Sequence, residues 1–158
     1  MTGVKQSECV FCLAAATLAN RADSAHSDDR LIVCAGRLAY VILNRYPYNS
    51  GHLMVVPHRH VGSLAALSSE EVMEIGVLTQ RSETALTDAY GPQGINVGIN
   101  LGKAAGAGVL DHLHVHIVPR WTGDTNFMTV VGDARVLPES LDASAERLRP
   151  IFARLTTQ

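Results

Sequence analysis

Short apolar runs separated by turn residues dominate the chain and predict strands. Each run is bounded by Gly, Pro, Asn or charged residues, which is typical of strands joined by turns. Gly36 separates the first two runs, and Pro57 closes the third. The five predicted strands cover residues 31–35, 38–43, 52–56, 95–101 and 112–118.

One longer segment has a helical period. Ser68 followed by Glu71 predicts a capping box, in which each side chain binds the other residue's backbone N–H at the start of a helix. Apolar residues then recur near the helical period, and Gly91 with Pro92 is expected to end the helix near Tyr90. The other predicted helices cover residues 9–20 and 139–154.

The order of these elements predicts an α+β domain on an antiparallel sheet. Strands joined by hairpins, with one long helix inserted and further helices at both ends, pack in this way. At 158 residues the chain suits a single domain. We divide it into an N-terminal arm (1–29), a core (30–131) and a C-terminal helical segment (132–158).

Composition argues against several kinds of partner. A formal net charge of −2 gives no basic surface for nucleic acid, and aromatic residues at 5% are too few for a platform of stacked bases. No apolar run approaches the roughly 20 residues of a membrane span. The apolar run after Val10 follows Lys5 as in a signal peptide, but Glu8 and two cysteines argue against that reading. We therefore expect neither a nucleic-acid nor a membrane partner.

The three cysteines indicate a reducing compartment. Cys9 and Cys12 have Cys-x-x-Cys spacing near a helix start, where both thiolates can point at one ion. That spacing alone is as typical of a redox pair or of chance. Because this cysteine usage does not suit a disulfide framework, we expect a cytoplasmic protein. Cys34 lies within a predicted strand and is expected in the core.

Six of the seven histidines gather in two short segments. Because strand side chains alternate between faces, we expect His112, His114 and His116 on one side of their strand, roughly 6.5–7 Å apart. Three rings at that spacing can surround one substrate group. Protonating one ring disfavours protonation of its neighbours, so at least one imidazole should stay neutral, which is the nucleophilic form. The other segment carries His52, His58 and His60.

Two other interpretations of the alternating histidines stay open. A solvent-facing strand can carry histidine without any function, although three in strict alternation beside a glycine-rich loop make that unusual. A zinc site of three histidines would need all three rings to converge, which alternation along a flat strand makes difficult.

A glycine-rich loop precedes these histidines. Gly102, Gly106 and Gly108 allow backbone conformations in which main-chain N–H groups face an anion. The loop is not a nucleotide-binding P-loop, because Ala104 follows Lys103 where Ser or Thr is required. Its place between a strand and three histidines predicts a cradle for phosphate.

With these motifs the chain resembles the histidine triad (HIT) superfamily. Residues 112–118 read His-Leu-His-Val-His-Ile-Val, like the family's signature, and residues 49–60 resemble its second signature, a Gly-His strand ending in Pro-x-x-His. The similarity extends over residues 9–129. It implies a five-stranded antiparallel sheet with helices, paired across a two-fold axis into a ten-stranded homodimer. It also implies cleavage at the α-phosphate of a nucleotide through a covalent nucleotidyl-histidine.

The resemblance assigns catalytic roles to four histidines. His114 is the expected nucleophile, and His112 is expected to support it. His116 and His52 are expected to contact or orient groups around the scissile phosphate.

Substrate contacts follow from the same resemblance. Asn44 matches the residue that binds the nucleotide ribose, and Asn100 matches an asparagine on the phosphate side. Gly106, Ala107 and Gly108 are the expected contacts in the glycine-rich loop. A divalent cation such as magnesium is expected to accompany the substrate.

Residues 44–52 and 119–127 look most like the dinucleoside-polyphosphate branch of the family, which contains diadenosine tetraphosphate phosphorylases and fragile-histidine-triad hydrolases. Before the triad, the hydrolases usually have Gln and the phosphorylases a Gly-Ser pair, whereas this chain has Ala107 and Gly108. No residue replaces the Gln as a group that orients water, while Lys103 and loop N–H groups can hold an anion. We therefore favour phosphorolysis of diadenosine tetraphosphate to ADP and ATP. Hydrolysis of diadenosine polyphosphates or of nucleoside phosphoramidates is the alternative.

Two further functions compete with this one. The first is a zinc-stabilised nucleotide-binding module without catalysis, which an intact triad disfavours. The second is a zinc-dependent hydrolase with the metal in the triad.

A structural zinc is the last expectation. Some bacterial members of the family join the Cys-x-x-Cys to the Pro-x-x-His histidine and to the first triad histidine. The corresponding ligands are Cys9, Cys12, His60 and His112. Two Cys and two His close a tetrahedral set without an open position, so the zinc would staple the N-terminal arm onto the sheet and fix His112. His58, outside this set, is expected to face solvent.

Overall fold

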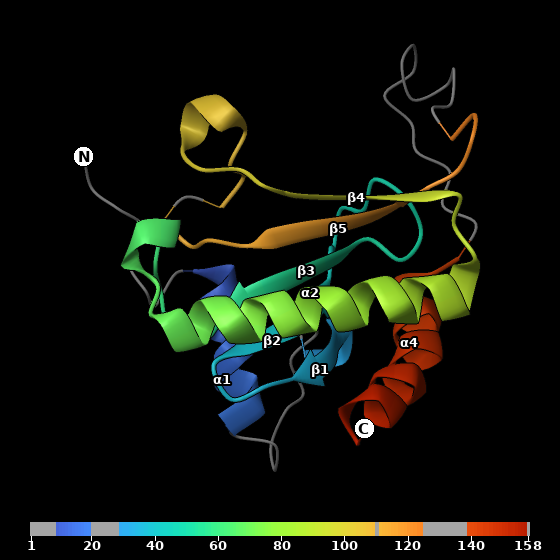
Figure 1. Ribbon diagram of the computed structural model, residues 1–158, viewed down its shortest axis with the longest axis horizontal. Coiled ribbons are helices and arrows are strands. Elements are labelled where there is room, and N and C mark those ends of the chain that lie inside the picture. The colour runs from blue at the N-terminus through green and yellow to red at the C-terminus, as the bar shows by residue number, and fades with distance from the viewer. Residues whose placement is uncertain (1–8, 20–28, 110, 125–138, 158) are drawn as a thin grey trace.

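One five-stranded antiparallel sheet organises the residues that the computed structural model describes, which are 9–19, 29–109, 111–124 and 139–157. The strands are β1 (Ile32–Ala35), β2 (Ala39–Leu43), β3 (Leu53–Pro57), β4 (Gly94–Ile99) and β5 (Val115–Arg120). Their order is β1-β2-β3-β5-β4, so β5 lies between β3 and the edge strand β4 (Figure 1). The predicted α+β architecture on an antiparallel sheet is confirmed.

Helices cover the sheet and close the core. The α-helices of the described part are α1 (Val10–Ala19), α2 (Ser69–Tyr90) and α4 (Leu141–Thr156). The long helix α2 connects β3 to β4 and runs across the sheet, and α4 packs beside it against β1 (Figure 1). Because β2 and β3 lie in the middle of the sheet under α2, every residue of both strands is buried. No helix in the described part of the chain is long and apolar enough to cross a membrane.

The predicted ends of α2 are confirmed. The Ser68 hydroxyl accepts from the Glu71 N–H (3.2 Å), and the Glu71 carboxylate accepts from the Ser68 N–H (2.7 Å). Arg59 donates to both carboxylate oxygens (2.9 and 2.7 Å), and this bond lowers the pKa of Glu71 to about 2. Gly91 ends the helix with a φ of +54°, a conformation that suits glycine. The Arg59–Glu71 pair therefore ties the segment that carries His60 to the first turn of α2.

The prediction of a strand from residue 112 is wrong, because β5 begins at Val115. Asp111 adopts a φ of +64°, and the Leu113 N–H donates to the carbonyl of Val61 (2.6 Å), a loop residue outside the sheet. The segment is therefore a turn whose hydrogen bonds go to the loop after β3. His112 and His114 therefore precede the strand, and only His116 lies on it.

Other boundaries differ by one or two residues from the prediction. β4 ends at Ile99 instead of 101, and α4 spans Leu141–Thr156 instead of 139–154. Residues 20–28 and 125–138 lie outside the described part of the chain, so the proposed division at residues 29 and 131 stays a prediction.

Candidate active site

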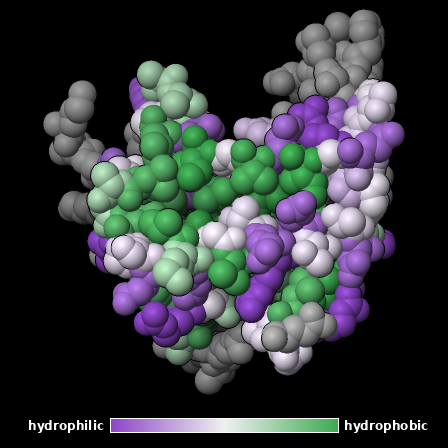
Figure 2. All heavy atoms as spheres, in the orientation of Figure 1, coloured by the Kyte–Doolittle hydropathy of each residue, from purple (hydrophilic) through white to green (hydrophobic). Residues whose placement is uncertain are grey.

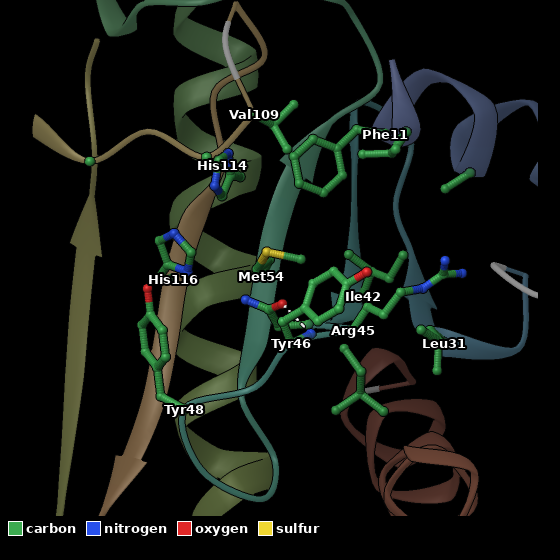
Figure 3. Close-up of a pocket in the computed structure, with 16 residues that line it drawn as sticks. Phe11, Leu31, Ile42, Arg45, Tyr46, Tyr48, Met54, Val109, His114 and His116 are labelled. Carbon is green, nitrogen blue, oxygen red and sulfur yellow. Dashed lines mark hydrogen bonds between the residues drawn. The ribbon is translucent and has the colours of Figure 1, made fainter. Parts of the chain in front are cut away.

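A cavity of about 470 Å³ opens beside the histidine segment. Its walls come from α1, from the segment that follows β2 and from the glycine-rich loop, and most of its lining is apolar (Figure 3). His114 and His116 lie along one side, and their ring centroids are 4.7 Å apart (Figure 3). A pocket with apolar walls and a few convergent polar groups is the usual form of a small-molecule site.

His114 is held in one tautomer by the backbone. Its Nδ1 lies 3.0 Å from the carbonyl oxygen of His112, and a carbonyl can only accept, so Nδ1 carries the proton. The Nε2 atom then keeps an unshared electron pair. Burial lowers the pKa of His114, which favours this neutral form. A buried neutral imidazole that lines a pocket is suited to nucleophilic attack.

His116 is oriented by a chain of hydrogen bonds through His52. The Tyr48 N–H donates to Nδ1 of His52 (3.1 Å), so the proton of the neutral His52 ring lies on Nε2. That Nε2–H donates to Nδ1 of His116 (3.0 Å), which leaves Nε2–H of His116 as a donor to a substrate. Burial and the neighbouring His114 lower the pKa of His116 to about 4. The roles of His52 and His116 were expected from the sequence, but no motif indicated that the Tyr48 N–H takes part.

The two expected asparagines lie on different sides of His116. Asn44 lines the apolar cavity, and its Oδ1 accepts from the Tyr46 N–H (2.9 Å). Asn100 lines a second hollow of about 230 Å³, together with the polar side chains of Asn96 and Arg120. His116 borders both spaces. The site therefore has an apolar side and a polar side.

The glycine-rich loop offers fewer N–H donors than the sequence suggested. Gly102 and Gly106 have φ values of +81° and +87°, as expected for glycines that a turn requires. However, the N–H of Gly106 donates to Lys103, and the N–H of Ala107 donates to Gly102. The loop's own turn thus uses both N–H groups, so the expected donation from Gly106 to phosphate does not fit this conformation. The Gly108 N–H donates to no residue that the structure describes.

The arrangement of His112 differs from the expectation of three rings around one substrate group. Its Nδ1 lies 3.2 Å from Sγ of Cys9 and 3.5 Å from Sγ of Cys12, and Nδ1 of His60 lies 3.3 Å from Sγ of Cys12. All four potential ligand atoms lie within 4.8 Å of one another. His112 therefore belongs to this group, while His114 and His116 belong to the cavity. A zinc site made of the three triad histidines is excluded by this placement.

These distances fit a tetrahedral ion. In a zinc site with Zn–S of about 2.3 Å and Zn–N of about 2.0 Å, sulfur and nitrogen ligands lie about 3.5 Å apart. The Nε2–H of His112 donates to the carbonyl of Pro57 (2.9 Å), which leaves Nδ1 unprotonated toward the cysteines, as a metal ligand requires. Burial, together with the adjacent Cys9, raises the pKa of Cys12 to about 11, so a cation is needed to hold the thiolate form. The four side chains can hold a metal ion.

Two expectations about neighbouring residues have different outcomes. His58 is half-buried rather than facing solvent, because its Nε2–H donates to the Gly36 carbonyl (3.1 Å) and its ring stacks on Tyr40. Cys34 packs partly buried against the core, close to its predicted place. Within the described residues, only the Cys9, Cys12, His60 and His112 group gathers metal ligands in this way, so a separate magnesium site gains no support.

A cluster of polar side chains that was not predicted from the sequence links the segment before His52 to the end of β5. Asn49 Nδ2 donates to the carbonyl of Pro119 and to Asp124, each at 2.9 Å. Arg120 binds the same carboxylate through two nitrogens (2.6 and 2.7 Å), and this bond holds the pKa of Asp124 well below its usual range. The cluster fixes the segment before His52 to the end of β5. Its only sequence signal was the likeness of residues 44–52 and 119–127 to one branch of the family.

Comparison with known proteins agrees with this geometry. The family model of the HIT domain matches residues 26–123. A Mycobacterium tuberculosis protein named AP-4-A phosphorylase is 45% identical over 127 residues, which are 80% of this chain and 65% of that protein. The chain thus spans slightly less than two thirds of that relative. A bis(5'-adenosyl)-triphosphatase of Dictyostelium discoideum is 34% identical over 122 residues, covering 73% of this chain and 80% of that protein.

Solved structures show the same fold. A Zn-bound histidine triad family protein from Mycobacterium smegmatis superimposes with a TM-score of 0.72 at 28% identity. The superposition covers 97% of this chain and 99% of that one.

The metal group leads to a first prediction. About one zinc ion per chain should co-purify, and Cys12→Ser should lower both the zinc content and the melting temperature, because structural zinc binding contributes to folding free energy. Metal analysis and thermal unfolding test this. Cys34→Ser is the matched control, since Cys34 lies outside the group, and it should keep its zinc. Equal zinc content in both variants would show that the four residues are not a site.

Proposed function

The chain belongs to the HIT family, and we propose that it is an enzyme that cleaves dinucleoside polyphosphates at the α-phosphate through a nucleotidyl group on His114. The observation that carries the proposal is the hydrogen bond from Nδ1–H of His114 to the His112 carbonyl, because it leaves Nε2 as the nucleophilic atom. His114 and His116 border one cavity, so a phosphate placed there can meet both rings. The names of the M. tuberculosis and D. discoideum relatives support the substrate class.

In the first step, Nε2 of His114 attacks the α-phosphorus of the donor nucleotide. A P–N bond forms, and the P–O bond to the rest of the polyphosphate breaks with its electron pair. The departing oxygen accepts a hydrogen bond from Nε2–H of His116, and the polyphosphate carries the charge. The His114 ring becomes positively charged, and the His112 carbonyl stabilises that charge through Nδ1–H. His112 thus supports the nucleophile through its backbone.

The two sides of the site suit the two parts of such a substrate. The apolar cavity offers space for the base of the donor nucleotide, with Asn44 near the ribose. The smaller hollow beyond His116 offers the side-chain amides of Asn96 and Asn100 to the remaining polyphosphate, while Arg120 there is paired with Asp124. Zinc bound by the cysteines and by His60 and His112 would neutralise the thiolates and hold α1 in place, without a part in either step.

In the second step an acceptor attacks the phosphorus, the P–N bond breaks, and His114 is restored. We favour inorganic phosphate as the acceptor over water. None of the described cavity residues takes the place of the Gln that is expected to orient water in the hydrolases, and the Gly108 N–H remains available to an anion. The 45% identity to a protein named as a phosphorylase supports the same choice. Hydrolysis of diadenosine polyphosphates is the second candidate, favoured by the likeness to the triphosphatase.

A homodimer is also part of the proposal. β4 is the edge strand of the sheet, and Val97 on it is 54% exposed. Val72, Met73 and Val77 on α2 are exposed as well. Figure 2 shows hydrophobic side chains gathered over β4 and the adjacent part of α2. An unpaired edge beside apolar surface is suited to pairing with a second copy, as the resemblance implied.

The nucleophile assignment predicts the effect of His114→Ala. Turnover of diadenosine tetraphosphate should fall by at least about 1,000-fold, because the covalent step has no substitute nucleophile. Steady-state kinetics measure this, with circular dichroism to confirm folding. His58→Ala is the control, since His58 lies outside both hollows, and it should stay within about tenfold of the wild type. A His114→Ala enzyme in the same range as the control would refute the assignment.

The acceptor assignment predicts the products. With diadenosine tetraphosphate, added inorganic phosphate should raise the rate and yield ADP and ATP, because phosphate takes the adenylyl group from His114. Water as acceptor would yield AMP and ATP instead. Separation of the nucleotides with and without phosphate distinguishes the two. A rate independent of phosphate, with AMP as the new product, would establish the hydrolase alternative.

The dimer proposal predicts the molar mass in solution. Sedimentation at micromolar concentration should give twice the mass of the chain. Val97→Asp should shift the equilibrium toward monomer, because it places a charge on the edge strand. Ala153→Asp adds the same charge at an exposed position of α4, which packs against β1 at the opposite edge of the sheet, and it should remain dimeric. A wild-type monomer would contradict the proposal.

A further inference from the structure

One aromatic side chain lies between the metal group and the cavity. Phe11 is located between Cys9 and Cys12 in the chain, and its ring is 5% exposed. The ring centroid lies 5.4 Å from that of His112 in an edge-on arrangement and 4.9 Å from that of His114. Phe11 also lines the 470 Å³ cavity (Figure 3). It therefore contacts a metal-group ring, the nucleophile and the pocket at once.

The helix that carries Phe11 is short, and its first turn contributes an important part of its attachment to the fold. α1 has ten residues, a length at which an isolated helix is marginally stable in water. Its buried residues are Phe11 and Ala14, whereas Val10 and Leu13 are each 50% exposed. The Tyr40 hydroxyl donates to the Phe11 carbonyl (2.8 Å) in the same turn. The position of the Phe11 ring thus depends on how firmly this turn is held.

The metal group holds that same turn. Cys9 immediately precedes α1 and Cys12 lies in its first turn, while His60 and His112 belong to the loops after β3 and before β5. With an ion bound, these four ligands join the start of α1 to the rigid part of the fold. Without one, the turn still has the packing of Phe11 and the Tyr40 bond.

We propose that Phe11 couples metal binding to nucleotide binding, as one wall of the donor pocket and as a positioning residue for His114. The inference rests on the proposed function, since it takes the cavity to hold the donor nucleotide. The hydrogen bond to the His112 carbonyl sets the tautomer of His114, and the Phe11 ring packs against the imidazole and restricts its rotation. Holding the first turn of α1 therefore preorganises both the pocket wall and the nucleophile.

Coupling of this kind is reciprocal. If a bound metal ion raises nucleotide affinity by some factor, the nucleotide must raise metal affinity by the same factor. The test measures zinc affinity by competition with a chelator, with and without saturating AMP, and AMP affinity with and without zinc. In the wild type both factors should be about tenfold.

Two variants of α1 separate the role of Phe11 from general effects on the helix. Phe11→Ala keeps all four ligands and should reduce both factors to within about twofold of unity. Leu13→Ala is the matched control, because Leu13 lies in the same turn but is exposed and does not line the cavity, and it should keep the wild-type coupling.

A third variant, Phe11→Leu, retains an apolar side chain and is used if Phe11→Ala folds poorly. With zinc bound, its kcat should fall by between about 10-fold and 100-fold, and its KM should change less, as displacement of His114 requires.

The outcomes separate this inference from the proposed function. If AMP binds the wild type equally with and without zinc, or if Phe11→Ala couples as strongly as the wild type, the inference is wrong and the proposed function stands. If the whole chain unfolds without zinc, AMP binding will depend on zinc in Phe11→Ala as well as in the wild type. That result would also overturn the inference, because the coupling would not depend on Phe11. If zinc-loaded wild type does not bind AMP, both fail.

Discussion

The hydrogen bond from Nδ1–H of His114 to the carbonyl of His112 is the interaction on which the rest of the site depends. It exists because the chain turns before β5, so that His112 directs its ring toward Cys9 and Cys12 while its carbonyl faces the next histidine. A regular strand would have placed both rings on one face. Because of the turn, His112 lies in the metal group and His114 lines the pocket. The hydrogen bond from His114 to the His112 carbonyl connects the two.

The sequence predicted the features that depend on residues close together in the chain. It did not predict features that depend on contacts between distant segments. The capping box of Ser68 and Glu71 and the members of the metal group were predictable from short motifs. The turn at His112 was not, because it depends on contacts with Val61 in another loop and with Pro57 at the end of β3. The glycine pattern predicted loop flexibility, but it could not show that the loop's own turn uses the N–H groups of two of its residues.

His116 divides the site into an apolar and a polar space, and this division suits a substrate with a base at one end and phosphates at the other. The chain His52 to His116 directs a single donor toward the boundary between them. Phe11 closes the apolar side and packs on the nucleophile. In this account, the metal group contributes to catalysis by holding the first turn of α1, and the chemistry itself belongs to the histidines.

The central claim is a covalent adenylyl group on His114, and it can be observed directly. The protein is mixed with diadenosine tetraphosphate and quenched with base, because a phosphorus–nitrogen bond to histidine is stable in base and labile in acid. Proteolysis and mass spectrometry then locate the modification. The account predicts an adenylyl group on the peptide that contains His114, assigned to that residue by fragmentation and removed on brief exposure to acid. Steady turnover without any adenylylated peptide, or with the group on another residue, would contradict it.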